Sequence, residues 1–272
     1  MLKAIWVSGL VGATCAFLSA YLMLKGWSLM GDALAHSIVP GVAGAYLLKI
    51  PFALGAFFAG FLAAIGMWFV RQQSKLREDA VIGIVFTSFF AMGLLLVSIN
   101  PTAVNVQSIV LGNILGISDE DALQVVITAT ITLTILVLKW KDLMVVFFDE
   151  SHARSVGLNP VALKLLFFTL LSASAVAALQ TVGACLVIAM VVTPGATAYL
   201  LTDRFERLLI LSVAFGAGTS MLGAYISYFL DGATGGVIVT LQTLLFLAAF
   251  VFAPKHGVLA ARRQSRQAQG PA

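Results

Sequence analysis

Residues 27–44 read WSLMGDALAHSIVPGVAG, an apolar stretch interrupted by one carboxylate and one imidazole. Asp32 and His36 lie four residues apart, so on a helix they share one face and can hold one divalent cation between them. Ionisable groups at membrane depth are costly, which makes such a pair a hypothesis about function. The alternative is that Asp32 caps the start of a helix while His36 packs among apolar neighbours. Spacing alone leaves both interpretations open.

The composition indicates a membrane protein. The chain has 272 residues, of which 60% are hydrophobic and 10% charged, and its mean hydropathy is +1.02. These values exclude an ordinary soluble domain, in which about 25% of the residues are charged. Apolar blocks of about 20 residues without strict alternation predict helices, because only helices and closed barrels satisfy the backbone in lipid. We therefore expect an all-α, polytopic transmembrane helical bundle.

The apolar blocks predict about nine spans, with eight as the alternative, at 4–24, 29–48, 52–70, 80–98, 123–138, 161–179, 182–201, 208–230 and 236–254. The first block is interpreted as a membrane helix rather than a signal peptide, because many spans follow it. Residues 106–117 predict a short interfacial or re-entrant helix. Residues 1–254 are expected to form one transmembrane domain, and residues 255–272 a polar, basic cytoplasmic tail.

The basic residues predict the orientation. In the nine-span arrangement only Lys3 and Lys49, of the 16 lysines and arginines, fall on the side of the N-terminus. The positive-inside rule therefore favours an outer N-terminus and an inner C-terminus. The net charge of +4 is spread over the loops between spans, which argues against a nucleic-acid partner. Both cysteines lie in apolar blocks and indicate neither a disulfide framework nor a zinc motif.

Several enzymatic motifs are absent from the sequence. It contains no Walker A phosphate-binding loop, no His-Glu-x-x-His pair and no Gly-x-Ser-x-Gly elbow. We therefore expect a transport subunit that does not itself hydrolyse ATP.

Pro40 follows the Asp32/His36 turn within the same apolar block. Proline in a membrane helix leaves a backbone carbonyl without its donor, and transporters use such breaks to add cation ligands. A simple kink is the alternative. A carboxylate oxygen together with an imidazole nitrogen suits Mn²⁺, Fe²⁺ or Zn²⁺.

The longest polar segment between spans, residues 147–160, reads FFDESHARSVGLNP. Asp149 and Glu150 favour the start of a short helix, and Glu150 can pair with Arg154 one turn later. Gly157 can end this helix in a left-handed conformation. The segment is either a capped surface helix or a coupling helix that docks on a cytoplasmic motor subunit.

These segments together resemble the membrane subunit of ATP-binding-cassette (ABC) importers for divalent metal ions. The resemblance covers nearly the whole chain and rests on GDALAHS at 31–37 followed by Pro40-Gly41, Asp-Glu-x-x-Ala-Arg-x-x-Gly at 149–157, TPGATA at 193–198 and APKHG at 253–257. Within the family the chain is most similar to the Sit/Yfe-type iron–manganese permeases of Gram-negative bacteria, on WSLMG at 27–31 and DGATGG at 231–236. Many zinc and manganese members carry Pro-Ser-Gly near 233–236, where this chain has Ala-Thr-Gly-Gly.

The resemblance implies a type II ABC importer-like fold in the bacterial inner membrane. Its implied partners are a cytoplasmic ATPase dimer, a periplasmic metal-binding protein, membrane lipid, and a second permease copy or a paralogue. It implies no permanently bound cofactor, and a transported ion that is Mn²⁺ or Fe²⁺, with Zn²⁺ also allowed. By motif match, the metal-gating pair is Asp32 and His36, and the residues that couple to the ATPase are Asp149, Glu150, Arg154 and Gly157.

Two other functions compete with this interpretation. A secondary transporter, driven by protons or Na⁺, would need no ATPase, but it would be expected to carry more acidic residues in its spans or an inverted repeat. Asp32 is the one acidic residue deep in a predicted span, and no repeat is detectable. A purely structural membrane partner would not need a carboxylate–imidazole pair.

Overall fold

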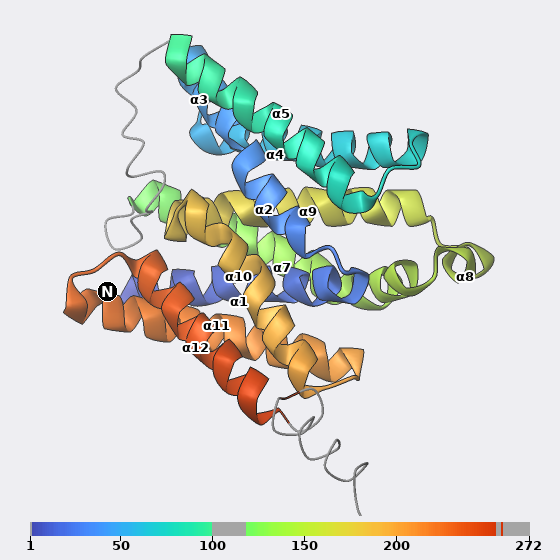
Figure 1. Ribbon diagram of the computed structural model, residues 1–272. Helices are drawn as coiled ribbons and strands as arrows, with labels where there is room; N and C mark the ends of the chain where they lie inside the picture. Colours follow the sequence, from blue (N-terminus) through green and yellow to red (C-terminus); the bar gives the residue numbers. More distant parts are fainter. Residues whose placement is uncertain (1, 100–117, 254–256, 258–272) are drawn as a thin grey trace, which may run out of the picture.

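The computed structural model describes residues 2–99, 118–253 and 257 (Figure 1). Its helices are α1 Leu2–Lys25, α2 Ser28–Ser37, α3 Val39–Leu48, α4 Phe52–Gln73, α5 Glu78–Ile99, α7 Asp119–Phe148, α8 Glu150–Ser155, α9 Pro160–Val182, α10 Ala184–Leu201, α11 Phe205–Leu230 and α12 Thr234–Phe252. The described ranges contain no strand, which confirms the predicted all-α class. The predicted helix at 106–117 and, apart from Gly257, the predicted tail at 255–272 lie outside the described residues.

Seven described helices are long and apolar enough to cross a membrane, namely α1, α4, α5, α7, α9, α11 and α12. The predicted number of nine is therefore wrong for helices of full spanning length, and two blocks account for the difference. The block at 29–48 divides into α2 and α3 at Ile38, close to Pro40, which has no N–H to donate. The block at 182–201 forms α10, which has 18 residues, near the lower limit for crossing a bilayer, and contains Pro194.

Helix α1 forms the centre of the bundle and packs against α7, α9, α10 and α11 (Figure 1). Small residues allow its close contact with α11. A Cβ atom added at Gly12 would overlap Ser220 and the backbone of Gly216. Near this crossing the Ser212 hydroxyl of α11 donates to the Ala16 carbonyl oxygen of α1 at 2.6 Å. Close backbone approach and interhelical hydrogen bonds are the interactions that hold helices together in lipid.

The break between α2 and α3 is held by α4 and α5. Gly41 of α3 and Gly55 of α4 pack backbone against backbone. On the other side, a Cβ atom added at Gly93 of α5 would lie 2.8 Å from the nitrogen of Pro40. Neither the contact with α4 nor the contact with α5 has room for a side chain in place of its glycine. The position of the break therefore depends on these two neighbouring helices.

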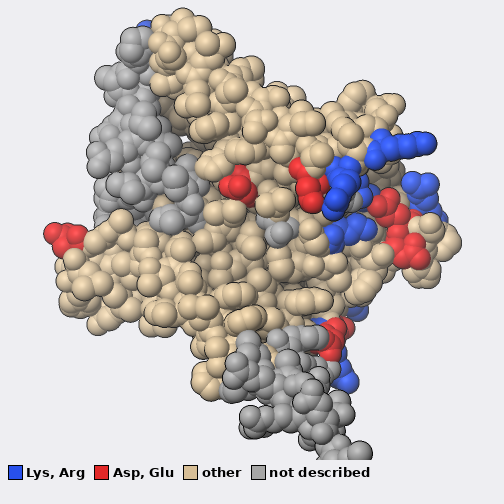
Figure 2. All heavy atoms as spheres, viewed as in Figure 1, with Lys and Arg blue, Asp and Glu red and all other residues tan. Residues whose placement is uncertain are grey.

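Charged residues gather at one end of the molecule. Figure 2 shows lysines and arginines concentrated, with several carboxylates, at the end where α8 lies in Figure 1. At the other end, where α1 and α7 begin, Lys3 forms an ion pair with Asp119. This asymmetry agrees with the distribution of basic residues expected from the sequence. The side of the membrane that each end faces remains a prediction of the positive-inside rule.

Candidate metal pair and coupling helix

Asp32 and His36 lie on one face of α2, as their spacing predicts. His36 Nε2 is 3.3 Å from Asp32 Oδ1, and the two side chains are 29% and 35% exposed, respectively. The capping alternative for Asp32 is wrong, because α2 begins at Ser28 and Trp27 occupies the N-cap position. The pair therefore presents one oxygen and one nitrogen side by side on a partly open surface.

Aromatic and aliphatic side chains surround the pair. The imidazole of His36 lies against two rings of α5, with centroid distances of 5.4 Å to Phe86 and 5.6 Å to Phe90. One residue before Asp32, Gly31 faces Val191 of α10, and a Cβ atom added there would lie 3.1 Å from the valine Cγ1. The pair is thus a small polar group on α2 with apolar side chains of α5 and α10 beside it.

Asp32 and His36 do not form a complete metal site by themselves. Among the described residues, no group of three or more histidine, cysteine, aspartate or glutamate side chains is close enough to hold one metal ion. Tetrahedral and octahedral ions need four to six ligands. An ion held here would therefore need further ligands besides these two side chains.

Helix α8 has hydrogen-bonded caps at both ends. The Asp149 carboxylate accepts the backbone N–H groups of Ser151 at 2.8 Å and His152 at 3.1 Å. At the other end Gly157 has a φ of +81°, the left-handed conformation that the sequence predicts. The Gly157 N–H donates to the Arg154 carbonyl, and the Leu158 N–H donates to the Ala153 carbonyl. This is the double hydrogen bond of a Schellman motif, and it fixes where α8 ends.

Glu150 has a different ion-pair partner from the one expected. It pairs with Lys164 of α9, whereas the sequence suggests a pair with Arg154 one turn away. The reason is burial: Lys164 is only 7% exposed and needs an opposite charge, whereas Arg154 is exposed to solvent. The pair fastens α8 to α9.

Both carboxylates at the start of α8 favour their charged forms. The two backbone N–H groups, from His152 first and Ser151 second, hold the pKa of Asp149 below its usual value. Burial acts to raise the pKa of Glu150, but the hydrogen bond and the positive charge of Lys164 outweigh it, so this pKa is also lowered.

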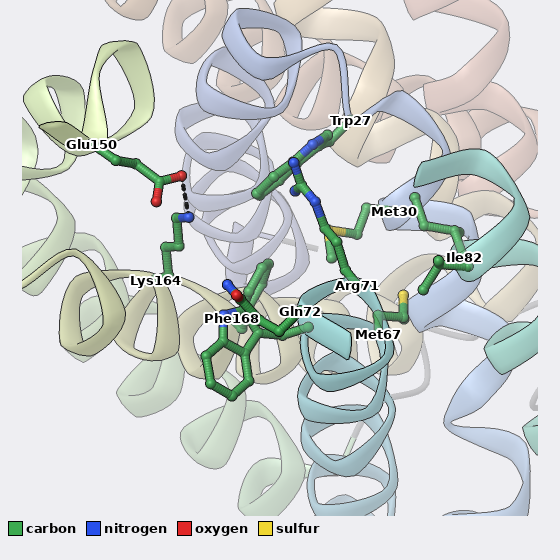
Figure 3. Close-up of a pocket in the computed structure, with 11 residues that line it drawn as sticks. Trp27, Met30, Met67, Arg71, Gln72, Ile82, Glu150, Lys164 and Phe168 are labelled. Carbon is green, nitrogen blue, oxygen red and sulfur yellow. Dashed lines mark hydrogen bonds and ion pairs between the residues drawn. The ribbon is translucent and has the colours of Figure 1, made fainter. Parts of the chain in front are cut away.

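A cavity of about 190 Å³ lies between the base of α8 and the start of α2 (Figure 3). Its walls include Trp27, Met30, Arg71, Glu150, Lys164 and Phe168. Sequence reasoning missed this group because its members come from segments that are far apart in the chain. The signal in the sequence was the WSLMG motif at 27–31, of which Trp27 and Met30 line the cavity.

Known proteins provide a further comparison. A family model described as the ABC 3 transport family matches residues 1–253. The chain is 72% identical over 266 residues to the chelated iron transport system membrane protein YfeC of Yersinia pestis, covering 98% of this chain and 90% of the relative. It is 50% identical over 274 residues to the manganese transport system membrane protein MntB of Synechocystis sp., covering 100% and 89%.

A solved structure, PsaBC from Streptococcus pneumoniae in complex with Fab, has a similar fold. The TM-score is 0.84 and the sequence identity 34%, with 96% of this chain and 94% of that chain covered. The matched fold, the family model and the identities agree over nearly the whole length of the chain. The chain belongs to the ABC 3 transport family.

Proposed function

We propose that this chain is the membrane-spanning permease of an ATP-driven importer that moves Mn²⁺ or Fe²⁺ from the periplasm to the cytoplasm. The observation that carries the proposal is the 3.3 Å contact between Asp32 Oδ1 and His36 Nε2 on a helix within an apolar bundle. Relatives named for iron and for manganese transport support these two ions. An oxygen–nitrogen ligand pair also allows Zn²⁺.

An incomplete site suits transport. An ion that must be released is bound transiently, and two protein ligands hold it less tightly than a closed cage does. Both side chains are partly exposed, so a second permease chain can face them. In a twofold dimer of identical chains, the same residues from both copies would provide four ligands. A paralogue with its own carboxylate and imidazole would serve equally well.

The break beside the pair provides polar backbone atoms at the same depth. Transporters place discontinuous helices at ion sites because unwound carbonyls can replace part of the hydration shell. Here α2 ends at Ser37, α3 begins at Val39, and Pro40 provides no N–H for the turn before it. The carbonyl oxygens of this turn are candidate ligands beside His36.

Helix α8 is the proposed contact with the ATPase dimer. Its caps give it a fixed length and direction, and it lies at the cationic end that the positive-inside rule assigns to the cytoplasm. Asp149, Glu150, Arg154 and Gly157 belong to it or to its caps. ATP hydrolysis then takes place on a separate subunit, and capture of the ion is left to a periplasmic binding protein.

The test is uptake of radioactive Mn²⁺ into proteoliposomes that contain the permease, with and without its ATPase. The proposal predicts uptake only when the ATPase and ATP are both present and the binding protein is supplied. Uptake driven by a proton or Na⁺ gradient without the ATPase would establish a secondary transporter instead. No uptake under any condition would leave the chain a structural membrane partner.

A further inference from the structure

Trp27 occupies the junction between α1 and α2. The chain turns at Gly26, which has a φ of +72°, and the Trp27 N–H donates to the Leu22 carbonyl at 2.8 Å. The Trp27 carbonyl in turn accepts the Met30 N–H at 3.1 Å in the first turn of α2. Asp32 follows Trp27, the N-cap residue of the same short helix, by five residues. At a rise of about 1.5 Å per residue, the metal pair begins about 7.5 Å along the helix axis from Trp27.

The Trp27 ring, which is 4% exposed, also contacts the base of α8. Its centroid is 5.5 Å from that of Phe147, which lies in the last turn of α7, two residues before the Asp149 cap. The carbonyl oxygen of Phe147 accepts a hydrogen bond from Lys25 at 3.3 Å, so the same point of α7 is bound to the end of α1. A displacement of the α7–α8 junction therefore reaches both sides of the α1–α2 turn.

A second connection runs through α9. Glu150 of α8 pairs with Lys164, and Phe168 lies one turn further along the same face of α9. The Phe168 ring stacks on Trp27 with a centroid distance of 5.9 Å. Figure 3 shows the Glu150–Lys164 pair and the Trp27 and Phe168 rings around one cavity.

Arg71 of α4 provides the third contact of the ring. Its guanidinium carbon lies 5.4 Å from the Trp27 ring centroid, a cation–π distance. Packed aromatic groups transmit small displacements because protein interiors have low compressibility. The ring borders the cavity of about 190 Å³, which leaves space into which the ring can shift.

We propose that Trp27 is a positioning residue that transmits movement of α8 to the Asp32/His36 pair by shifting the start of α2. This inference rests on the proposed function, in which α8 contacts the ATPase and the pair binds the ion. Trp27 itself is neither a ligand of the ion nor a residue of α8. It sets where the pair lies when the base of α8 moves.

The experiment uses the complete complex of permease, ATPase and binding protein in proteoliposomes. The readout is the number of Mn²⁺ ions taken up per ATP hydrolysed, normalised to assembled complex. We expect Trp27→Ala to lower this ratio by about tenfold, within the range of coupling free energies measured between distant sites. Trp27→Phe keeps an aromatic ring at the junction and is expected to restore most of the ratio.

Phe17→Ala is the matched control. Phe17 is a ring of α1 with similar burial. It stacks on Tyr21, whose ring lies 5.6 Å from Phe147, so Phe17 is one ring further from the α8 base than Trp27 is. A purely structural role for Trp27 predicts that both alanine variants reduce the amount of complex and leave the ions moved per ATP unchanged, and this result would overturn the inference. If the wild-type complex itself shows no ATP-dependent uptake, the proposed function fails instead, so the two failures are distinguishable.

Discussion

Helices α2 and α8 are both short and charged, yet their ends are built in opposite ways. The six residues of α8 have a carboxylate cap at the start and a glycine-based double hydrogen bond at the end. The ten residues of α2 have no side-chain cap and end at a break that α4 and α5 hold in place. Local interactions therefore fix α8, whereas tertiary contacts position α2. A fixed helix suits a contact that receives force, and a helix positioned by its neighbours suits a site that must shift.

The largest expected effect is the loss of the pair on α2. Asp32→Asn or His36→Ala should lower uptake by at least about 100-fold, since changes to outer-shell partners of metal ligands already cost about 10–100-fold. The measurement is ATP-dependent Mn²⁺ uptake at equal membrane abundance. Uptake at the wild-type rate in either variant would reduce the pair to packing residues.

The second prediction breaks the rigid end of α8. Gly157→Val places a β-branched residue at a φ of +81°, where a non-glycine residue costs about 1–2 kcal/mol. No atom lies within 4 Å of a Cβ added at Gly157, so the penalty comes from the backbone alone. We expect uptake to fall by about tenfold, with the ATPase either dissociated or hydrolysing ATP without transport.

Asparagine tolerates the left-handed region better than valine does. Gly157→Asn is therefore the matched variant and should retain most of the transport. Co-purification and ATPase assays on the two variants separate dissociation from uncoupling. Full transport in Gly157→Val would show that the segment is an ordinary loop.

The third prediction concerns the attachment of α8 to α9. Glu150→Gln removes the charge that compensates Lys164. We expect the free energy of unfolding to fall by about 1–2 kcal/mol, because the lysine is buried while the glutamate remains partly exposed. An exposed pair such as the one expected with Arg154 would contribute only about 0.3–0.5 kcal/mol. Thermal unfolding of Glu150→Gln and Arg154→Gln tests the difference. Equal effects of the two substitutions would contradict the assignment of Lys164 as the partner.

The smallest effect is an acid-dependent loosening of α8. The folded state lowers the pKa of Asp149, so its contribution to stability is present above the ordinary aspartate pKa and is lost as the pH falls through the lowered value. Near pH 7 no change is expected. Asp149→Asn keeps a capping oxygen that does not titrate and should lack this component. Amide hydrogen exchange of residues 150–155 below about pH 4 measures it, and identical acid profiles for both proteins would exclude the cap as its source.

What the sequence predicts well is local. The helical class follows from the apolar blocks, the shared face of Asp32 and His36 from helical spacing, and the left-handed end of α8 from Gly157. The number of full-length helices could not be predicted, because an apolar block has the same composition whether it is continuous or broken near Pro40. The Glu150–Lys164 pair and the contacts of Trp27 were also missed, because they depend on how α7, α8 and α9 pack together.

The central claim is that the transported ion is bound by Asp32 and His36. Pulsed electron–nuclear double resonance of Mn²⁺ bound to the complete complex, prepared without nucleotide, tests this claim most directly. We predict a ¹⁴N coupling from a directly bound imidazole in the wild type, and loss of this coupling in His36→Ala. A wild-type Mn²⁺ signal without nitrogen coupling, or a coupling that persists unchanged in His36→Ala, would contradict the account.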